Sequence, residues 1–398
     1  MRTLKSCPAL LSGILLAVAC AASRAAEPGA IVLVGGVLRY DNRLAWQRIV
    51  ALAGGPGARF AVFPTATGRP RIYGGFAVRA LRDHGASAAL IPISPKAEAI
   101  GVDYRRAVRD ETLLARVRSA DGIFFTGGAP QYIARTLYEP GGAATPMLEA
   151  IREVHAGGGV IAGANVGRFV LATGIGAATA LRDGLSDQAL HPGLGLLPGH
   201  WFIDQHYFTH GRFAASLEAM RKLAIKRGIG VGANTALVIT GGRRAEVISA
   251  GRAMLVDLSQ ARFHDSGQPF SLRKGRLSYL AKGDSFDLHT LRVNPYDSQA
   301  EGFAVASAAA DRSSSSVQPS SAVDVFAPAA LNGLIFSVVA GERRQGVGLA
   351  FAGSPAAFRF LFYAGRDSFA WVSGANDYTA TNVYLDVTPL DGPAAVGQ

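Results

Sequence analysis

Cysteine is nearly absent from this 398-residue chain, which contains only Cys7 and Cys20. Both lie among the first 26 residues, so cleavage after Ala26 would leave a chain without any thiol. That excludes a disulfide, a thiolate nucleophile and a cysteine metal site from the remaining residues. A chain of this length can be stabilised by its hydrophobic core alone.

Long apolar runs are also scarce. Ala9–Ser23 is the one long uncharged run; a short basic segment precedes it and small residues follow it up to Ala26. This layout is typical of a secretory signal, so we expect export to the periplasm or beyond. No other run reaches 18 residues, so we expect a soluble mature chain without an integral membrane span. The alternative is a lipoprotein anchor at Cys20, but the usual leucine three positions before the cysteine is missing.

Charged residues make up only 17% of the chain, and the net charge is +11. Loss of three basic residues with the signal would leave +8. The basic residues form pairs but no longer runs, and no aromatic residues alternate with them, which argues against nucleic-acid binding. An acidic polymer, an anionic surface or simple solubility all remain compatible with this charge.

From Ile31 to about Arg292, short apolar runs alternate with longer amphipathic stretches. Continuous apolar strands alternating with helices indicate an α/β fold with a mostly parallel sheet and helices on both faces. Sites in such folds form at the carboxyl ends of the strands. We predict strands at Ile31–Val34, Arg59–Phe63, Ala88–Pro92, Gly122–Phe125, Gly159–Ala162, Gly230–Val231 and Ala236–Ile239. We predict helices at Arg43–Ala53, Gly75–Asp83, Arg109–Ser119, Ala129–Tyr138, Met147–Ala156, Asn165–Leu171 and Gly211–Lys226.

The C-terminal part has a different composition. Residues 297–323 are rich in Ala and Ser and predict a linker between an α/β domain over 27–296 and a small β module over 324–398. Strands are predicted there at Leu334–Val339, Val347–Phe351, Phe358–Tyr363, Phe369–Val372 and Val383–Val387. Such a module is either a structural lid or edge for the first domain, or a surface-binding module.

The sharpest local motif is Gly163-Ala-Asn165-Val-Gly167, directly after a predicted strand. A Gly-x-x-x-Gly turn between strand and helix is typical of a nucleophile elbow, where the central side chain projects above the sheet and helix N–H groups hold an oxyanion. Here the tip is Asn165, whose amide is a poor nucleophile. An alternative interpretation is that Asn165 only satisfies the geometry of the turn.

Other motifs surround histidines and glycine-rich turns. Asp204, Gln205 and His206 are consecutive, and His206 is either a catalytic base or a buried, hydrogen-bonded histidine. The histidines at 200, 206 and 210 lack an acidic partner at metal-ligand spacing, so no metal is expected. The turns at 127–128 and 157–159 lack a Walker lysine and a full dinucleotide fingerprint, so no cofactor is expected.

Together and in this order, six short motifs resemble the cyanophycinase branch of the peptidase E-like serine peptidases. They occupy residues 124–128, 163–167, 193–198, 204–206, 228–238 and 282–287. The resemblance covers about Ile31 to Arg292 and implies a three-layer α/β/α sandwich related to class I glutamine amidotransferases. It also implies hydrolysis of cyanophycin, a polyaspartate with arginine on its β-carboxyls, to β-Asp-Arg dipeptides by serine, histidine and glutamate without a metal.

The resemblance assigns the histidine to His206, the nucleophilic serine position to Asn165 and the glutamate position to Ala233. It assigns substrate-binding positions to Gln131, Asp204, Gln205 and Arg212, and the oxyanion and elbow positions to Gly128, Gly163, Val166 and Gly167. A basic residue implied three positions after Arg212 is Ala215.

Loss of a triad nucleophile lowers kcat on the order of a millionfold, and loss of the acid then adds little. The leading hypothesis is therefore an exported, inactive or impaired relative that binds an Asp/Arg-containing peptide or polymer. The alternatives are a hydrolase that uses His206 with a non-serine nucleophile or water, and a non-catalytic scaffold that binds a surface or partner. The oligomeric state stays open, with a homodimer among the candidates.

Overall fold

The computed structural model describes residues 27–36, 38–96, 100–163, 169–172, 175–197, 200–249, 251–264, 269–296, 302–305, 323–340, 344–351, 357–374 and 377–390. The predicted export signal at 1–26 and most of the predicted linker lie outside these residues. No helix in the described ranges is long and apolar enough to cross a membrane.

A nine-stranded sheet with strands from Ile31 to Asn294 forms one half of the molecule, in the order β16-β15-β11-β10-β1-β5-β4-β2-β3. The five strands from β1 to β3 in this order are parallel, as predicted, and the four on the other side of β1 are antiparallel. The strands are β1 (Ile31–Val34), β2 (Arg59–Phe63), β3 (Ser87–Leu90), β4 (Gly122–Phe125), β5 (Val160–Gly163), β10 (Ala236–Thr240), β11 (Arg244–Val247), β15 (Ser285–Asp287) and β16 (Val293–Asn294).

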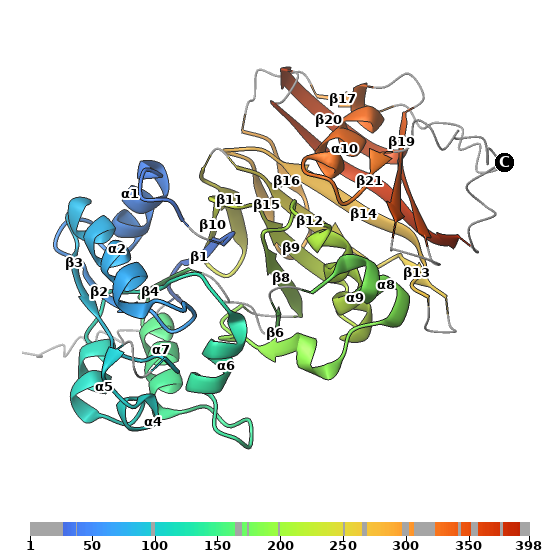
Figure 1. Cartoon of the computed structure of the whole chain (residues 1–398). Helices are drawn as coiled ribbons and strands as arrows, with labels where there is room; N and C mark the ends of the chain where they lie inside the picture. The colour runs from blue at the N-terminus through green and yellow to red at the C-terminus, as the bar shows by residue number, and fades with distance from the viewer. Residues whose placement is uncertain are drawn as a thin grey trace, which may run out of the picture.

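Helices cover both faces of the parallel part of this sheet (Figure 1). They are α1 (Arg43–Leu52), α2 (Pro70–Asp83), α4 (Tyr104–Ala107), α5 (Glu111–Arg118), α6 (Pro130–Leu137) and α7 (Pro146–Ala156). Proline occupies the first turn of α2, α6 and α7, where its missing N–H costs no helical hydrogen bond. One core packs α1 and α2 against strand residues such as Val32 and Val62, and another packs α5, α6 and α7 against the opposite face. The mixed α/β fold with a parallel sheet is therefore confirmed.

A ten-stranded sheet forms the other half, in the order β18-β19-β20-β21-β14-β12-β9-β8, with β13 and β17 pairing beside this path. Its strands are β8 (Trp201–Gln205), β9 (Arg227–Val231), β12 (Ala253–Asp257), β13 (Arg262–Phe263), β14 (Leu272–Leu280), β17 (Phe303–Ala304), β18 (Val323–Asp324), β19 (Gln345–Phe351), β20 (Ala357–Gly374) and β21 (Asp377–Leu390). One face of β8, β9 and β12 packs on the first sheet, and the helices α8 (Ala177–Asp183), α9 (Arg212–Lys222) and α10 (Ala330–Ala340) cover the other face. A separate ladder pairs β6 (Phe169–Leu171) with β7 (Leu190–Pro192), after a 3₁₀ turn at Asp187–Ala189.

The C-terminal residues differ from the sequence-based expectation in two ways. Leu334–Val339, predicted as a strand, lies within α10, because six buried apolar residues of Ala330–Ala340 pack at helical spacing on the second sheet. The strands after it do not build a sheet of their own, since β21 pairs with β14 and extends the second sheet. Phe303–Ala304, inside the predicted linker, forms β17 against β20. From the sequence, residues 324–398 are either a structural lid or edge or a surface-binding module. The described strands of this segment form the edge of the second sheet.

Three chain segments meet at one edge of the first sheet. Because β10 is antiparallel to β1, its first residue Ala236 pairs with Val34, the last residue of β1. Only four residues separate the end of β9 at Val231 from β10, and β9 runs parallel to β8, with Val231 opposite Gln205. The residues after β1, after β8 and before β10 are therefore brought together by topology alone.

The C-terminal hairpin is anchored through a buried carboxylate. Asp284 is 2% exposed and accepts hydrogen bonds from the N–H groups of Ala281 and Tyr296 and from the hydroxyl of Thr379 on β21. Burial raises the pKa of Asp284, and these donors oppose that shift. Each donor offsets part of the desolvation of the carboxyl group, and the hydroxyl of Thr379 is the one among them that ties β21 to this carboxylate.

We predict that Thr379→Val lowers the free energy of unfolding by about 1–3 kcal/mol, because a buried acceptor loses its donor while the side-chain shape is kept. Thr388→Val is the matched control, since Thr388 lies on the same strand with an exposed side chain. Urea denaturation of both variants measures the difference. Equal stabilities would contradict the anchoring role of Asp284.

Candidate functional site

His206 lies at the meeting point of these segments, one residue beyond the end of β8. Its backbone adopts a left-handed conformation with φ +56°, which few non-glycine residues adopt. The imidazole lies against Gly36, the second residue after β1: a Cβ atom at Gly36 would be 2.2 Å from the ring Cε1 and 2.3 Å from Nε2. Gly36 itself has φ +101°. The ring position therefore depends on the absence of a side chain at residue 36.

The surroundings of His206 favour the neutral imidazole. His206 is exposed, yet the part of its ring that neighbouring residues cover lowers its pKa below the ordinary value. The charge of Arg212 lowers this pKa further, and the charge of Asp204 opposes the shift. A neutral imidazole can accept a proton at neutral pH, as a general base requires. An exposed imidazole at this place is compatible with a general base, and it does not fit the alternative of a buried, hydrogen-bonded histidine.

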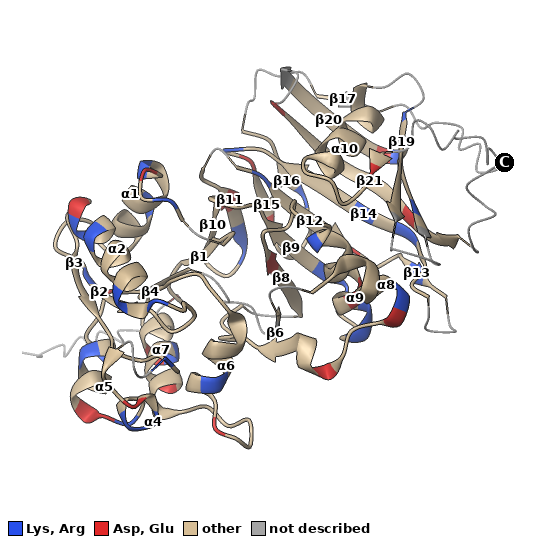
Figure 2. Cartoon of the chain, viewed as in Figure 1, with Lys and Arg blue, Asp and Glu red and all other residues tan. Residues whose placement is uncertain are grey.

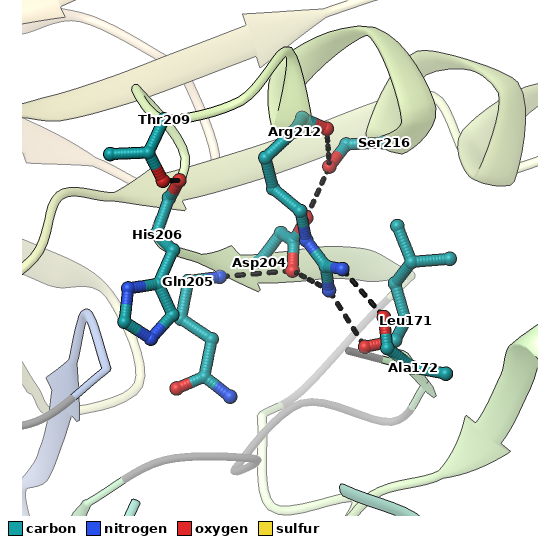
Figure 3. A network of polar contacts seen from close by, with 8 residues as sticks. All are labelled: Leu171, Ala172, Asp204, Gln205, His206, Thr209, Arg212 and Ser216. Atoms are coloured by element: carbon teal, nitrogen blue, oxygen red, sulfur yellow. Dashed lines mark hydrogen bonds and ion pairs between the residues drawn. The ribbon is translucent and has the colours of Figure 1, made fainter. Parts of the chain in front are cut away.

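Asp204 and Arg212 form a buried ion pair beside His206 (Figure 3). Arg212 Nε donates to Asp204 Oδ2 at 2.7 Å and Nη2 donates to Oδ1 at 2.8 Å. The same guanidinium donates to the carbonyls of Leu171 and Ala172 at 2.7 and 2.6 Å. Ser216 donates its hydroxyl to Asp204 Oδ2, and the N–H of Gln205 donates to Oδ1 at 3.0 Å. The two predicted substrate-binding residues therefore bind each other and join β8, α9 and the end of β6.

The two predicted glutamines lie differently. In Figure 3 the side chains of Gln205 and His206 point to the same side of β8, away from the Asp204–Arg212 pair. Gln131 lies in the first turn of α6, and its Oε1 is buried with no hydrogen-bond partner among the described residues. A buried amide oxygen without a donor is costly, so Gln131 is suited to accept a hydrogen bond from a bound ligand.

Ala233, to which the resemblance assigns the position of the acid, is exposed and follows Gly232. A Cβ atom at Gly35 would be 1.8 Å from the Gly232 carbonyl oxygen, so the main chains around residues 35 and 232 are in close contact. Ala233 also lines a surface hollow of about 550 Å³ together with Asn42 and Asn234. A side chain longer than alanine at residue 233 could therefore extend into this hollow. It would lie near the Gly35-Gly36 segment, which contacts the His206 ring.

The elbow is described only at its start. Gly163 ends β5 with φ +130°, and a Cβ atom there would be 2.3 Å from the Phe125 carbonyl oxygen, so glycine is required. Asn165, Val166 and Gly167 lie outside the described residues. The helix predicted over 165–171 is wrong for its last three residues, because Phe169–Leu171 form β6 and pair with β7.

Gly128, predicted beside the oxyanion position, follows β4 at the same edge of the sheet. Its φ is +146°, and a Cβ atom there would be 2.1 Å from the Ala66 carbonyl oxygen. Within the described part of the chain, the N–H groups of Gly127 and Gly128 donate to no protein acceptor. Two such N–H groups side by side are suited to an anionic oxygen.

Sequence reasoning missed Gly36 and Ser216. The sequence did contain a signal for a site at Gly36. A Gly-Gly pair follows the apolar run of β1 at residues 35–36, as another follows β4 at residues 127–128. Ser216 has no sequence signal, because only the turn of α9 places it one turn after Arg212. Ala215 beside it is fully buried, so a basic side chain there would be buried too. The described residues contain no group of three or more side chains able to hold a metal ion.

Comparison with known proteins gives a consistent picture. A model of peptidase family S51 matches residues 31–247. The chain is 26% identical over 277 residues to a cyanophycinase of Trichormus variabilis, covering 67% of this chain and 88% of that protein. It is 28% identical over 280 residues to a cyanophycinase of Synechococcus elongatus, covering 67% and 81%. A solved structure of a peptidase from an acI-B1 Actinobacterium aligns with a TM-score of 0.47 and 21% identity, covering 66% of this chain and 97% of that one.

We predict that Arg212→Leu lowers the free energy of unfolding by about 3–5 kcal/mol, because it leaves the Asp204 carboxylate buried without a counter-charge. Arg182→Leu is the control: Arg182 has the same two-bond geometry with Asp183, but both side chains are more exposed. Its loss should cost at most about 1 kcal/mol. Urea denaturation compares the two, and similar losses would show that the Asp204–Arg212 pair is not structurally important.

We predict that His206 titrates below its ordinary pKa of 6.5. The unfolded chain, where the histidine pKa is about 6.5, then binds the proton more tightly than the folded chain. Protonation of His206 therefore lowers the free energy of unfolding as the pH falls below about 6.5. NMR titration, with the His206 signal assigned from the His206→Gln variant, measures the pKa. Wild type should lose more stability than that variant between neutral and mildly acidic pH, and a pKa at or above 6.5 would contradict the prediction.

Proposed function

Because the chain belongs to peptidase family S51 as a cyanophycinase-like member, we propose that it binds an aspartyl-arginine peptide or polymer and hydrolyses it poorly or not at all. The observation that carries the proposal is the composition of the site. His206, whose surroundings lower its pKa, lies just beyond the end of β8 and against Gly36, while the resemblance assigns asparagine and alanine to the nucleophile and acid positions.

The chemistry of acyl transfer explains the expected loss of activity. In a serine peptidase the histidine takes the hydroxyl proton, and the acid keeps the imidazole in the correct tautomer. Asn165 has no hydroxyl to activate and Ala233 has no carboxylate to orient the ring. Without a nucleophile, only oxyanion binding and substrate binding still accelerate the reaction. These two effects alone give a rate that is orders of magnitude below that of a complete triad.

Ligand binding does not require the missing groups. Gln131 offers a buried amide oxygen without a donor, which suits the guanidinium or amide N–H of an arginine-bearing ligand. The N–H groups of Gly127 and Gly128 suit its carboxylate oxygens. In this proposal Gln131 and Gln205 touch the ligand, whereas Asp204 and Arg212 act as positioning residues by holding β8 and β6.

The proposal also includes the location of the protein. The basic, apolar and small-residue segments of the first 26 residues support export, where a polymer-binding protein would meet material outside the cytoplasm. The positive net charge supports attraction to an acidic backbone. Figure 2 shows the basic positions spread over helices and strands of both halves, so this attraction is general rather than confined to one segment.

The test is release of β-Asp-Arg from cyanophycin, together with calorimetric binding of the dipeptide. We predict binding without measurable release by the natural sequence, and release by the double variant Asn165→Ser/Ala233→Glu. Replacing His206 by alanine in the double variant should abolish that release and serves as the control. Release by the natural sequence that is lost in His206→Ala would overturn the proposed inactivity, and absence of dipeptide binding would overturn the proposed ligand.

A further inference from the structure

An aromatic cavity lies on the other side of Gly36 from β8. It has a volume of about 540 Å³ and is bounded by the ends of β1 and β4 and by the helices α1 and α2. In Figure 1 these two helices lie beside one another next to β1 and β4. The cavity floor contains Trp46 and Phe124, whose ring centroids are 4.9 Å apart and whose side chains are buried. Of the site residues predicted from the sequence, Gly128 alone is among the residues that line this cavity.

The rim of this cavity consists of aromatic side chains that remain unusually exposed. Tyr40, Tyr73 and Phe76 are 49%, 44% and 50% exposed. Tyr73 and Phe76 pack edge to face, and the Tyr40 hydroxyl donates to Asp83 at the end of α2, so the rim is held in place. Exposed aromatic residues gathered around a hollow are typical of a ligand site, because a bound apolar group would remove their surface from water.

The charges at the cavity define the polar end of its ligand. Arg79 lies on α2 one turn after Phe76 and lines the cavity, and it has no ion-pair or hydrogen-bond partner within the described residues. Arg39, the other cation at the rim, is paired with Asp41. Gly127 and Gly128, whose N–H groups donate to no acceptor in the described part of the chain, line the same cavity. The site therefore offers donors and positive charge, and no lining residue is acidic.

Gly36 connects this cavity to His206. It lines the cavity, and the His206 ring lies directly against its Cα. A ligand that fills the cavity consequently ends beside the imidazole.

We infer that this cavity binds a bulky apolar or aromatic group that carries a carboxylate, such as an aromatic amino acid or the aromatic end of a peptide. The ring packs against the exposed Phe76, above the floor of Trp46 and Phe124, and the carboxylate pairs with Arg79. This goes beyond the proposed function, because an aspartyl-arginine polymer contains no aromatic group.

Calorimetry with the purified protein tests the inference, using N-acetyl-L-phenylalanine as the probe. Its primary amide tests the role of the carboxylate, and β-aspartyl-phenylalanine tests whether the source is a peptide. We expect Phe76→Ala to weaken binding of the acid about tenfold through lost aromatic contact. Arg79→Gln should weaken the acid about tenfold and leave the amide unchanged.

Two control variants match these changes. Ile72→Ala removes an equally exposed apolar side chain from the same helix, outside the cavity, and Arg116→Gln removes an exposed arginine from α5. Neither should change binding. Tighter binding of the dipeptide than of the acetylated acid would identify a peptide end as the ligand, and equal binding would identify a free aromatic acid. No binding to wild type, or equal affinities of wild type and Phe76→Ala, would overturn the inference whatever the result with β-Asp-Arg.

Discussion

The buried ion pair between Asp204 and Arg212 is the interaction on which the arrangement of the site depends. Its carboxylate is 2% exposed and is bound by a guanidinium, a hydroxyl and a backbone N–H. Its guanidinium also binds two carbonyls at the end of β6. Full hydrogen bonding offsets the large desolvation cost of two buried charges. The pair thereby fixes the end of β8, and with it the position from which His206 leaves the strand.

A second constraint is the close approach of the Gly35-Gly36 segment to Gly232 and to the His206 ring. Gly35 contacts the carbonyl of Gly232, and Gly36 contacts the imidazole, at distances that no side chain would permit. Since β1, β9 and β10 all have ends here, the topology of both sheets brings these glycines together. Alanine at residue 233, where the resemblance assigns the acid of the family, is compatible with this main-chain packing, because the contacts involve glycine rather than the side chain of residue 233.

In the proposed function, this family scaffold binds its ligand at this edge of the sheet without the catalytic groups that the resemblance assigns to residues 165 and 233. The same edge has polar donors at Gly127 and Gly128, a buried amide at Gln131 and a cavity with an aromatic rim at Tyr73 and Phe76. Such a combination favours recognition of a ligand with both charged and apolar parts. The long β20–β21 hairpin continues the second sheet, so the C-terminal residues stabilise this scaffold through contacts such as Thr379 with Asp284.

The sequence by itself determined the elements whose signals are local. Apolar runs placed β1, β2 and β4 at their observed residues, since continuous apolar segments between turn residues are characteristic of buried strands. Ordered short motifs identified the family, and they predict site roles for Asp204, Gln205 and His206. Local pattern failed for Leu334–Val339, where a run of apolar residues fits a buried helix as well as a strand and only packing on the second sheet decides. Only the tertiary structure joined Arg212 to Asp204, set Gly36 against His206 and formed the aromatic cavity between α1, α2 and the strand ends. The reason is physical, because no local propensity encodes contacts between separate elements. Gly36 and His206 are far apart in the chain, as are the walls of the cavity, and Arg212 and Asp204, although eight residues apart, lie on a helix and a strand whose packing sets their distance.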